Sequence, residues 1–470
     1  MVHQIFEKLI TRLAPLQDQL PPLYLVGGQV RDMLLGRPAA DIDLVCARAE
    51  ATARRIARAW NVSLVPFHKK GRWTCFRIVF GNDPQETLDM TSFQGATLAA
   101  DLGRRDFTIN AMALEIGPNG PGRIIDLFGG REDLQSGLVR MTSDAVFTAD
   151  SVRILRGFRF CAQLGFTLDP ATQQRLTEQA GLLSRAAPER ISAELYKLFA
   201  SPACCPVIRQ MDQAGALTVL FPEIASLKDC EQNDYHHLDV WEHSLEALKH
   251  IDDILDRLPE VFPGNWKQIQ DMLETHENRA VLKLGVLLHD LGKPGTRGLN
   301  PKTGRITFYG HERAGAEDVD RLARRLRLSV RNRDLLFTLV AEHIHVYALS
   351  RPGVKASTRM RFFRTYGDRA LLCMLLGLAD IKARQGPAAS PDERARYCEW
   401  AAQAVDEYFQ ADWSPEKKTP LISGKDLLEL GLKPGPAIGR ILNQIQEAED
   451  DGLIQTREQA WDLVEKLVQQ

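Results

Sequence analysis

The sequence predicts an α+β protein in which a head of short strands and helices precedes an all-helical remainder. Between Leu23 and about Gly130, short β-branched and apolar runs are interrupted by glycine and proline, as in strands joined by turns. From about Asp144 onward, apolar residues recur at helical spacing instead. Nine of the eleven histidines lie between His236 and His345. The two regions are therefore expected to carry different chemistry.

The individual elements follow from these patterns. The expected strands of the head are 23–26, 41–45, 74–80, 87–90 and 124–127. The expected helices are 151–164, 189–199, 240–251, 280–288 and 318–328. Segments rich in proline, glycine or polar residues at 202–206, 222–234 and 384–393 are expected to be connections. Near the C-terminal end, 421–427 and 431–439 have the proline and glycine pattern of helix starts.

Composition excludes several classes of protein. The 470 residues are 44% hydrophobic and 26% charged, which suits a globular chain of two to four domains rather than a disordered one. A net charge of -2 excludes a histone-like polycation, so any nucleic-acid contact must use local basic surface. The eight cysteines form no CxxC pair, which argues against a zinc ribbon or a disulfide scaffold. No secretion signal is evident and no apolar run reaches the ~18 residues of a membrane span, so we expect a cytoplasmic protein with no membrane partner.

A strand that ends in two glycines is the first candidate functional feature. The expected strand 23–26 runs into Gly27 and Gly28, and a helix is expected to begin there. Two glycines allow backbone N–H groups to approach a phosphate at a helix N-terminus, where Arg31 adds positive charge. An ordinary strand–helix turn has the same pattern, so this feature alone leaves both interpretations open.

Two aspartates in the next expected strand form the second feature. Because side chains alternate along a strand, Asp41 and Asp43 are expected on one face, with Ile42 and Leu44 on the other. Neighbouring carboxylates suit a divalent cation of the kind that two-metal nucleotidyl transfer requires. A solvated strand end is the alternative for the pair alone, but the preceding glycine turn favours a metal site.

Four motifs in order resemble those of class II tRNA nucleotidyltransferases and bacterial poly(A) polymerases. They are GGQVRD at 27–32, DIDLV at 41–45, RRDFTINAMA at 104–113 and DLFGGREDL at 126–134. The likeness continues through 149–156 and 189–195 and covers roughly the first 225 residues. The resemblance implies a small mixed-sheet, polymerase β-like nucleotidyltransferase head followed by an all-α neck.

The resemblance also implies roles for the matching residues. It implies that Asp41 and Asp43 hold Mg²⁺ as the catalytic carboxylates, with Asp89 as a candidate third carboxylate on the neighbouring strand. The remaining residues that it implies in nucleotide binding are Gly27, Gly28, Arg31, Arg105, Asp106, Asn110, Asp150, Arg153 and Arg156. Among these, Gly27, Gly28 and Arg31 would contact the triphosphate. Asp106, with Arg105 and Asn110, would hold the ribose and its phosphates and select ribonucleotides.

Two of these residues concern the choice of nucleobase. Asp150 and Arg153 are three apart in an expected helix, so they would share a face and offer an acceptor and a fork of donors. The resemblance implies that this pair reads the Watson–Crick edge of C or A. The chain departs from the family at Ala149, where relatives usually have Glu.

A short connection bears on which nucleotide is added. CCA-adding members of the family have a longer flexible loop between the acidic strand and the RRD motif, whereas here only Ser92 to Gly103 separates them. In the family such shortening accompanies enzymes that add CC and stop. We therefore predict addition of CC rather than of the full CCA.

A second resemblance lies in the helical part. The ordered residues His243, His289–Asp290, His311, His343 and Asp380 look like the pattern of an HD phosphohydrolase domain. A buried His–Asp pair after an apolar helix is costly without a metal ion. The resemblance implies that His243, His289, Asp290 and Asp380 hold one divalent ion, that His311 and His343 could hold a second, and that Lys293 could contact a phosphate. The metal's identity is left open.

These observations together predict four domains and one principal activity. The expected domains are a nucleotidyltransferase head at 1–140, a nucleobase- and RNA-binding neck at 141–225, an HD-type body at 226–400 and a tRNA-contacting tail at 401–470. The predicted function is untemplated addition of C to the tRNA 3′ end from CTP, with ATP as a further substrate left open, Mg²⁺ in the head and a metal-dependent phosphohydrolase in the body.

Three points stay open at this stage. A poly(A) polymerase or an A-adding enzyme of the same superfamily is one alternative, and an HD phosphohydrolase with an RNA-binding head is another. The arginines of segment 321–333 fit either a solvated helix face or an RNA contact. The sequence does not determine the oligomeric state.

Overall fold

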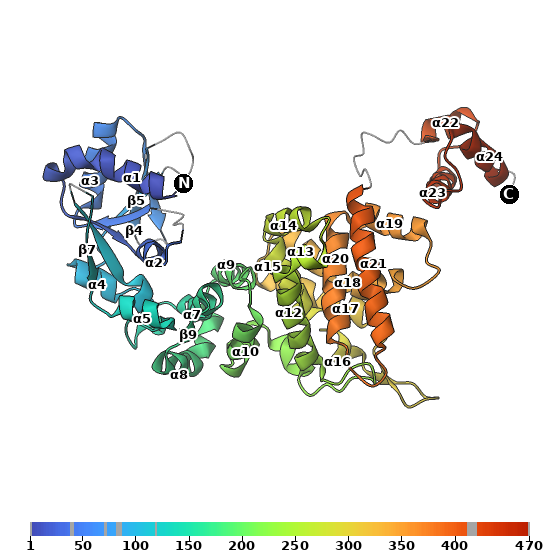
Figure 1. The fold of residues 1–470 in the computed structure, drawn as a ribbon, viewed down its shortest axis with the longest axis horizontal. Coiled ribbons are helices and arrows are strands. Elements are labelled where there is room, and N and C mark those ends of the chain that lie inside the picture. The colour runs from blue at the N-terminus through green and yellow to red at the C-terminus, as the bar shows by residue number, and fades with distance from the viewer. Residues whose placement is uncertain are drawn as a thin grey trace. The chain divides into compact units, whose positions relative to one another are not determined.

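The computed structural model describes residues 2–37, 42–69, 73–80, 87–117, 120–410 and 421–468 (Figure 1). The chain divides into two compact units, Met1–Glu194 with Gln210–Leu220 and Leu195–Arg209 with Phe221–Gln470. The expected four-domain division is finer than these two units and stays a prediction. Each unit is described here by itself.

A seven-stranded mixed sheet forms the centre of the first unit (Figure 1). Its strand order is β3-β4-β5-β2-β1-β6-β7. The strands are β1 (Leu23–Val26), β2 (Ile42–Cys46), β3 (Leu64–Lys69), β4 (Trp73–Val79), β5 (Thr87–Ser92), β6 (Met112–Gly117) and β7 (Gly120–Asp126). Only β2 and β5 pair in parallel, and the other neighbours are antiparallel. The predicted mixed-sheet α+β head is confirmed.

Two of these strands were not predicted from the sequence. β3 contains Pro66, which weakens a strand signal, but β3 lies at an edge of the sheet, where a missing backbone N–H is tolerated. β6 lies inside the sheet between β1 and β7, and its residues Met112, Ala113 and Leu114 are buried in succession. A strand buried on both faces lacks the polar alternation by which strands are recognised.

Helices cover the sheet and connect its strands. They are α1 (Val2–Leu13), η1 (Ala14–Gln19), α2 (Gly28–Leu34), α3 (Ala49–Trp60), α4 (Leu98–Gly103), η2 (Thr108–Asn110) and α5 (Gly130–Ser136). Helix α3 packs on β4 and β5 with Ala53, Ile56 and Ala57 fully or nearly buried. This spacing is that of an amphipathic helix with one face in the core.

The first unit continues as a helical segment. It comprises α6 (Val146–Ala149), α7 (Val152–Leu164), α8 (Pro170–Gln179), η3 (Ala180–Arg185), the first part of α9 (Pro188–Phe199) and α11 (Ala216–Leu220), with α10 (Cys205–Gln213) crossing the unit boundary. A short parallel pair, β8 (Leu138–Val139) and β9 (Thr167–Leu168), lies beside it. Helix α8 begins where expected for its sequence, since Asp169 caps it and Pro170 occupies its first turn.

The second unit is built around a bundle of helices. Helices α12 (Val240–Asp256), α15 (Asn278–Leu288), α18 (Val330–Leu349) and α20 (Asp368–Ala383) pack on one another, and α17 (His311–Arg325) packs on α18. Smaller elements are η4 (Pro222–Leu227), α13 (Leu258–Val261), α14 (Trp266–Glu274), α16 (Lys293–Thr296), the hairpin β10 (Gly298–Leu299) and β11 (Ile306–Thr307), α19 (Ala356–Tyr366) and α21 (Pro391–Gln410). The predicted helical body is confirmed.

A group of three helices ends the chain, with its own small core. These are α22 (Gly424–Glu429), α23 (Pro436–Asp450) and α24 (Arg457–Val468). Their apolar side chains meet around Leu427, Ile445 and Val464. Ser423 and Asp426 cap α22 reciprocally, and Pro436 opens α23, as the sequence predicted. Across the described ranges, no helix combines the length and apolarity that crossing a lipid bilayer would require.

Candidate functional site

Two carboxylates lie side by side on the central strands of the head. Asp43 of β2 and Asp89 of β5 are paired residues in the parallel register, so their side chains project from the same face of the sheet. Asp89 is nearly buried and accepts hydrogen bonds from Nε and Nη2 of Arg77, at 2.7 and 2.9 Å. The predicted neighbour relation between the strands is therefore present. Asp41, the other predicted catalytic carboxylate, lies outside the described residues.

The glycine turn between β1 and α2 lies against the RRD motif. Gly27 has φ 77° and ψ −141°, a conformation in which only glycine is unstrained. A Cβ on Gly27 would come within 2.9 Å of Nη1 of Arg105. Arg31 donates to Oδ1 of Asn110 at 2.7 Å and pairs with Asp32. The structure thus joins four predicted nucleotide-binding residues, Gly27, Arg31, Arg105 and Asn110, from two distant motifs.

Asp106 is the buried centre of a second group of contacts. Arg156 donates to its Oδ2 at 2.6 Å through Nε, while Asn110 and the Phe107 N–H donate to its Oδ1 at 3.1 and 2.9 Å. Burial alone would raise the pKa of Asp106, but the charge of Arg156 and these hydrogen bonds outweigh it and lower the pKa to about 2. Asp106 is therefore held as an anion, able to accept hydrogen bonds at any physiological pH.

Three arginines of this region lie around the aromatic ring of Phe160. The guanidinium carbons of Arg31, Arg156 and Arg159 lie 5.1, 5.3 and 4.2 Å from the ring centroid of Phe160. Arg159 was not predicted as a site residue. Burial lowers its pKa to about 10 although Glu194, at 3.2 Å, opposes that shift. The sequence contained a pattern that could have predicted Arg159 as a site residue, because Arg156 and Arg159 are three apart on one helix and so share a face.

The predicted base-reading pair is arranged differently from the expectation. Asp150 is not part of a helix: it lies in extended conformation between α6 and α7, and α7 begins only at Val152. It accepts a hydrogen bond at 2.7 Å from Arg190. Arg153 donates to the Arg104 carbonyl at 2.8 Å. The idea of a helical i, i+3 pair was therefore wrong, and Arg190 is a partner that the sequence reasoning missed.

The short connection that bears on nucleotide choice is fully described. Only residues 93–97 lie between β5 and α4. The buried side chain of Asp101 accepts from the Gln94 N–H at 2.8 Å and from Arg105 Nη2 at 3.0 Å. One carboxylate thus ties this connection to the RRD motif.

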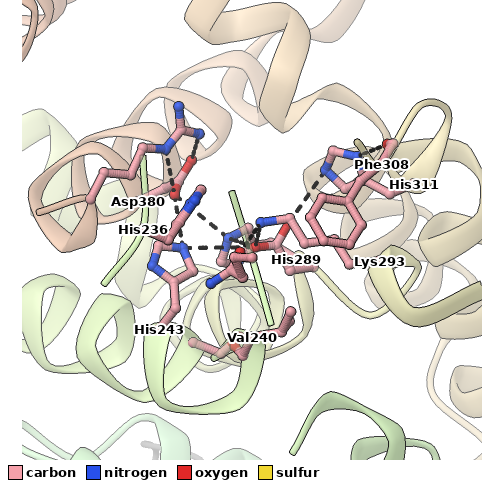
Figure 2. Close-up of polar contacts among 12 residues, drawn as sticks. His236, Val240, His243, His289, Lys293, Phe308, His311 and Asp380 are labelled. Carbon is pink, nitrogen blue, oxygen red and sulfur yellow. Dashed lines mark hydrogen bonds and ion pairs between the residues drawn. The ribbon is translucent and has the colours of Figure 1, made fainter. Parts of the chain in front are cut away.

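The six residues of the predicted HD pattern come together in the helical body. Figure 2 labels His243, His289, His311 and Asp380 among them. The six residues come from different elements: His243 from α12, His289 and Asp290 from the end of α15, His311 from the start of α17, His343 from α18 and Asp380 from α20. All six are buried. We name these six residues the HD cluster.

Short distances join the members of the HD cluster. Nε2 of His243 lies 3.1 Å from Asp380, and Nε2 of His289 lies 3.1 Å from Asp290. Nε2 of His311 lies 3.4 Å from Asp290 and 3.2 Å from Nε2 of His343. The Nδ1 atoms of His289, His311 and His343 face the backbone carbonyls of Val286, Phe308 and Val340 at 2.8, 2.7 and 2.7 Å. Those carbonyls favour a proton on Nδ1, which turns an unprotonated Nε2 toward the carboxylates.

The protonation states suit a divalent metal ion. Burial, with a smaller effect of the nearby His289 and His311, lowers the pKa of His343 to about 3. Burial opposes ionisation of Asp290, yet His289 and Lys293 hold its pKa well below the usual range. Burial likewise opposes ionisation of Asp380, but the charge of Arg384 outweighs burial and holds the pKa of Asp380 well below its usual range. Asp290 and Asp380 raise the pKa of His289 despite its burial, so a metal ion bound there would displace a proton from this imidazole. Imidazole nitrogens with ionised carboxylates are donors that a metal ion of the zinc, manganese or iron type prefers, so the donor set fits one.

Three residues around the HD cluster were missed by the sequence reasoning. His236 lies beside His243, with ring centroids 4.6 Å apart, and forms a candidate ligand trio with His243 and Asp380. Arg384 donates through Nε to Asp380 at 3.1 Å. Gln232 accepts at 2.6 Å from Lys293, which also contacts Asp290 at 2.6 Å. Of these three, only His236 could have been suspected from the sequence, because it is one of the nine histidines concentrated in this region.

The arginine-rich segment 321–333 carries mainly intramolecular contacts. Arg324 pairs with Asp320 at 2.8 Å, Arg325 with Glu223 at 2.6 Å and Arg333 with Asp320 at 3.3 Å. Arg331 donates to Asn278 at 3.1 Å, and Arg321 pairs with Asp318. These contacts favour the interpretation of a salt-bridged surface over that of an RNA-binding face.

Comparison with protein families agrees with this division of sites. Residues 23–140 match the poly A polymerase head domain, residues 165–228 match the family described as "Probable RNA and SrmB- binding site of polymerase A", and residues 240–384 match the HD domain. The first match contains the carboxylate strands and the third contains all six residues of the HD cluster.

Several relatives align over nearly the whole chain. The A-adding tRNA nucleotidyltransferase of Deinococcus radiodurans is 34% identical, covering 97% of this chain and 98% of the relative. The CC-adding tRNA nucleotidyltransferase of Thermus thermophilus is 32% identical, covering 93% and 91%. The Thermotoga maritima CCA-adding enzyme complexed with tRNA has the same fold, with a TM-score of 0.66 at 22% identity over 99% of this chain and 98% of that one. The chain therefore belongs to the tRNA nucleotidyltransferase family, in its form with a poly(A) polymerase head and an HD domain.

Proposed function

We propose that the head adds cytidine from CTP to the 3′ end of tRNA without a nucleic-acid template. The observation that carries this proposal is the convergence of the RRD and glycine-turn motifs, through the contacts of Arg31 with Asn110 and of Arg105 with Gly27, beside the strand pair of Asp43 and Asp89. The relatives from Deinococcus radiodurans and Thermus thermophilus are named for adding A and CC respectively. Membership in the family therefore leaves the nucleotide to be argued from this chain.

The residues of the head have distinct parts in this reaction. Asp43, with Asp41 and Asp89 as further carboxylates, would hold Mg²⁺, which activates the attacking 3′-hydroxyl and neutralises the triphosphate when bound. The open backbone at Gly27 and Gly28 and the charge of Arg31 would receive the phosphates. Asp106, kept anionic by Arg156, would accept a hydrogen bond from a ribose hydroxyl. Asp150 and Arg153 would face the base, and Arg190 orients Asp150.

The choice of CC over CCA rests on the connection between β5 and α4. Adenine and cytosine present different donors and acceptors, so one pocket must rearrange to accept both in turn. Residues 93–97 form a short link whose start is fastened by Asp101 to Arg105. This link is short, and Asp101 fastens it to the RRD motif. It therefore leaves the nucleobase pocket little freedom to rearrange from accepting cytosine to accepting adenine. We infer that the enzyme stops after two cytidines and that another enzyme supplies the final adenosine.

One direct experiment tests this proposal. A tRNA ending at the discriminator base is incubated with CTP, ATP, both or neither, and the products are separated on a sequencing gel. The proposal expects two added cytidines with CTP, and no further product when ATP is present. A ladder of adenosines would instead indicate the poly(A) polymerase alternative. Addition of a single A only to a tRNA already ending in CC would indicate an A-adding enzyme.

A second function, metal-dependent phosphohydrolysis, is favoured by the HD cluster. Among the described residues, three candidate ligand trios share members and form one chain of donor atoms: His243–His289–Asp290 and Asp290–His311–His343 within the HD cluster, and His236–His243–Asp380, in which the neighbouring His236 is partly exposed. A bound divalent ion would polarise a phosphoryl oxygen and lower the pKa of a water molecule. The buried ammonium of Lys293, which contacts Asp290, would contact a phosphate at this site. This arrangement argues against a purely structural role for the body, while the carboxylates of the head argue against a chain that is only a phosphohydrolase.

We also propose that the enzyme works in the cytoplasm. None of the eight cysteines, each within the described residues, forms a disulfide, and six of them are buried. Burial raises the pKa of Cys161 to about 12 and keeps its thiol protonated. Cysteines without disulfides are typical of a reducing compartment. Fractionation of the cells that make this protein, with blotting of each fraction, is the corresponding test.

A further inference from the structure

A polar pocket lies next to the HD cluster and takes no part in the functions proposed so far. Its volume is about 230 Å³. Its walls include Tyr235, Tyr347, Arg351, Arg384, Glu393 and Arg394. These residues come from the segment before α12, from α18 and the turn that follows it, and from the connection between α20 and the first turn of α21.

The charges of this pocket favour an anionic ligand. Three guanidinium groups face one carboxylate, and that carboxylate, Glu393, already accepts a hydrogen bond from the Tyr347 phenol. Arg384 is neutralised by Asp380. Within the described ranges, neither Arg351 nor Arg394 forms an ion pair with a carboxylate, Arg394 donates through Nη2 to the Arg384 carbonyl, and its buried Nε has no hydrogen-bond acceptor. Two guanidinium groups therefore face the single carboxylate of Glu393, which leaves the pocket with a net positive charge.

The pocket is preformed by contacts between its walls. The N–H groups of Gly386 and Ala388 donate to the carbonyls of Tyr235 and Asp234 at 3.0 and 2.9 Å. These hydrogen bonds join the loop before α12 to the loop between α20 and α21. A Cβ on Gly386 would come within 2.3 Å of the Asp234 carbonyl, so this close approach requires glycine. A pocket whose walls are already joined loses less conformational entropy on binding than one that must form around its ligand.

The pocket and the HD cluster share a wall. The Arg384 guanidinium lines the pocket and also contacts Asp380 of the cluster. Tyr235 lines the pocket, and the next residue, His236, has its ring 4.6 Å from that of His243. A molecule bound at the cluster through one phosphate would therefore have the pocket as its neighbouring site for a second anionic group.

We propose that Arg351 and Arg394 bind a non-scissile phosphate of a nucleotide whose other phosphate is hydrolysed at the HD cluster. This inference rests on the proposed phosphohydrolase function and names its substrate class, a nucleotide with two separate phosphate groups. Guanidinium groups match phosphate oxygens with paired, charge-assisted hydrogen bonds. The second phosphate would orient the substrate, so it would improve binding more than turnover.

The test compares two substrates that differ by one phosphate. Adenosine 2′,3′-cyclic phosphate and its 5′-phosphorylated counterpart are hydrolysed by the metal-loaded enzyme, and kcat/KM is measured for each. We expect the 5′-phosphate to raise kcat/KM by about 10- to 100-fold, mainly through KM, as one or two charge-assisted hydrogen bonds would. In the double variant Arg351→Gln, Arg394→Gln, the ratio of the two kcat/KM values should fall to near one. Arg324→Gln, which alters an exposed arginine of α17, is the control and should keep the wild-type ratio.

A second measurement separates this inference from the phosphohydrolase function. Phenylglyoxal labels accessible arginines, and mass spectrometry reports the labelling of Arg351 and Arg394 individually, so ligand bound to the head does not interfere. Adenosine 5′-monophosphate should slow the labelling of both residues with or without metal. Protection without hydrolysis of either substrate would disprove the phosphohydrolase function and leave the phosphate pocket standing. Absence of protection, or hydrolysis that ignores the 5′-phosphate, would overturn the inference.

Discussion

The guanidinium of Arg105 lies so close to Gly27 that a methyl group on the α-carbon would come within 2.9 Å of Nη1. This approach joins the turn that follows β1 to the RRD motif, although the two are far apart in the chain. Asp101 pairs with Nη2 of the same guanidinium at 3.0 Å. The glycine turn, Arg105 and the connection before α4 are therefore coupled by direct contacts, and a change in any of them should weaken nucleotide binding.

Substitution Gly27→Ala should disturb these contacts in two ways. The backbone conformation at Gly27 costs a non-glycine residue roughly 1–3 kcal/mol, and the new methyl group would displace Arg105. We expect a loss of at least 10-fold in kcat/KM for CTP addition, measured with tRNA in excess. Gly36→Ala is a matched control, because Gly36 also has a positive φ, 65°, but its Cβ would meet no neighbour. Equal losses in both variants would mean that backbone strain alone matters.

Replacement of the carboxylate of Asp43 should abolish nucleotide addition. Asp43→Ala, like Asp41→Ala, removes a metal-binding oxygen donor, and the expected loss of rate is more than 1,000-fold, as for essential groups of phosphoryl transfer. Binding of tRNA, followed by filter retention, should stay nearly intact because phosphate contacts are made elsewhere. Asp144→Asn, at an exposed carboxylate, should behave as wild type. Activity within tenfold of wild type in Asp43→Ala would exclude the assignment.

Arg153→Ala should change selectivity more than chemistry. In the proposed function Arg153 contacts the base, and it donates a hydrogen bond to the Arg104 carbonyl. We expect the preference for CTP over UTP, measured as a ratio of kcat/KM values, to fall by about 10-fold or more, as loss of a charged hydrogen-bond donor would cause. Arg190→Ala, which releases Asp150, should reduce the same ratio. Retention of the wild-type preference in both variants would show that other residues read the base.

Lengthening the connection after β5 should allow the enzyme to add adenosine as well as cytidine. Insertion of a flexible loop between Gln94 and Ala96 lengthens the segment that Asp101 fastens. We expect the variant to add some A after CC when CTP and ATP are supplied together, whereas the unmodified enzyme stops at CC. Insertion of the same loop after Gly304, in the turn of the β10–β11 hairpin, is the control and should leave the product at CC. Efficient CCA synthesis by the unmodified enzyme would return the chain to the CCA-adding class.

The HD cluster should be separable from the head. The double variant His289→Ala, Asp290→Ala removes ligands from two of the three trios, so bound metal, measured by plasma emission after dialysis, should fall by at least half. Hydrolysis of 2′,3′-cyclic phosphates should disappear while CTP addition with added Mg²⁺ persists. His276→Ala, at a histidine outside the cluster, should retain both activities. Loss of both activities in a folded double variant would show that the two sites depend on each other.

Local patterns in the sequence were sufficient for several parts of the site. The period of two in 41–45, the glycine turn at 27–28 and the helical spacing at 151–164 each report on residues close in the chain. The resemblance to the HD domain likewise predicted the six residues that meet in the HD cluster, but it did not predict His236 beside them. β3 and β6 escaped because proline at a sheet edge and burial on both faces weaken the strand pattern. Asp150 was misplaced because the break between α6 and α7 interrupts a sequence that is otherwise helical.

The sequence by itself determined the fold class, the helical body, the family and the six residues that meet in the HD cluster. Only the tertiary structure determined which side chains become their neighbours: Arg77 contacts Asp89, Arg190 contacts Asp150, Arg105 lies next to Gly27, and His236 lies beside His243. It also decided that Arg351 and Arg394 share one pocket next to the HD cluster. The physical reason is that periodicity and turn chemistry act over a few neighbouring residues, whereas these pairs depend on strand order and helix packing, which the whole core sets at once.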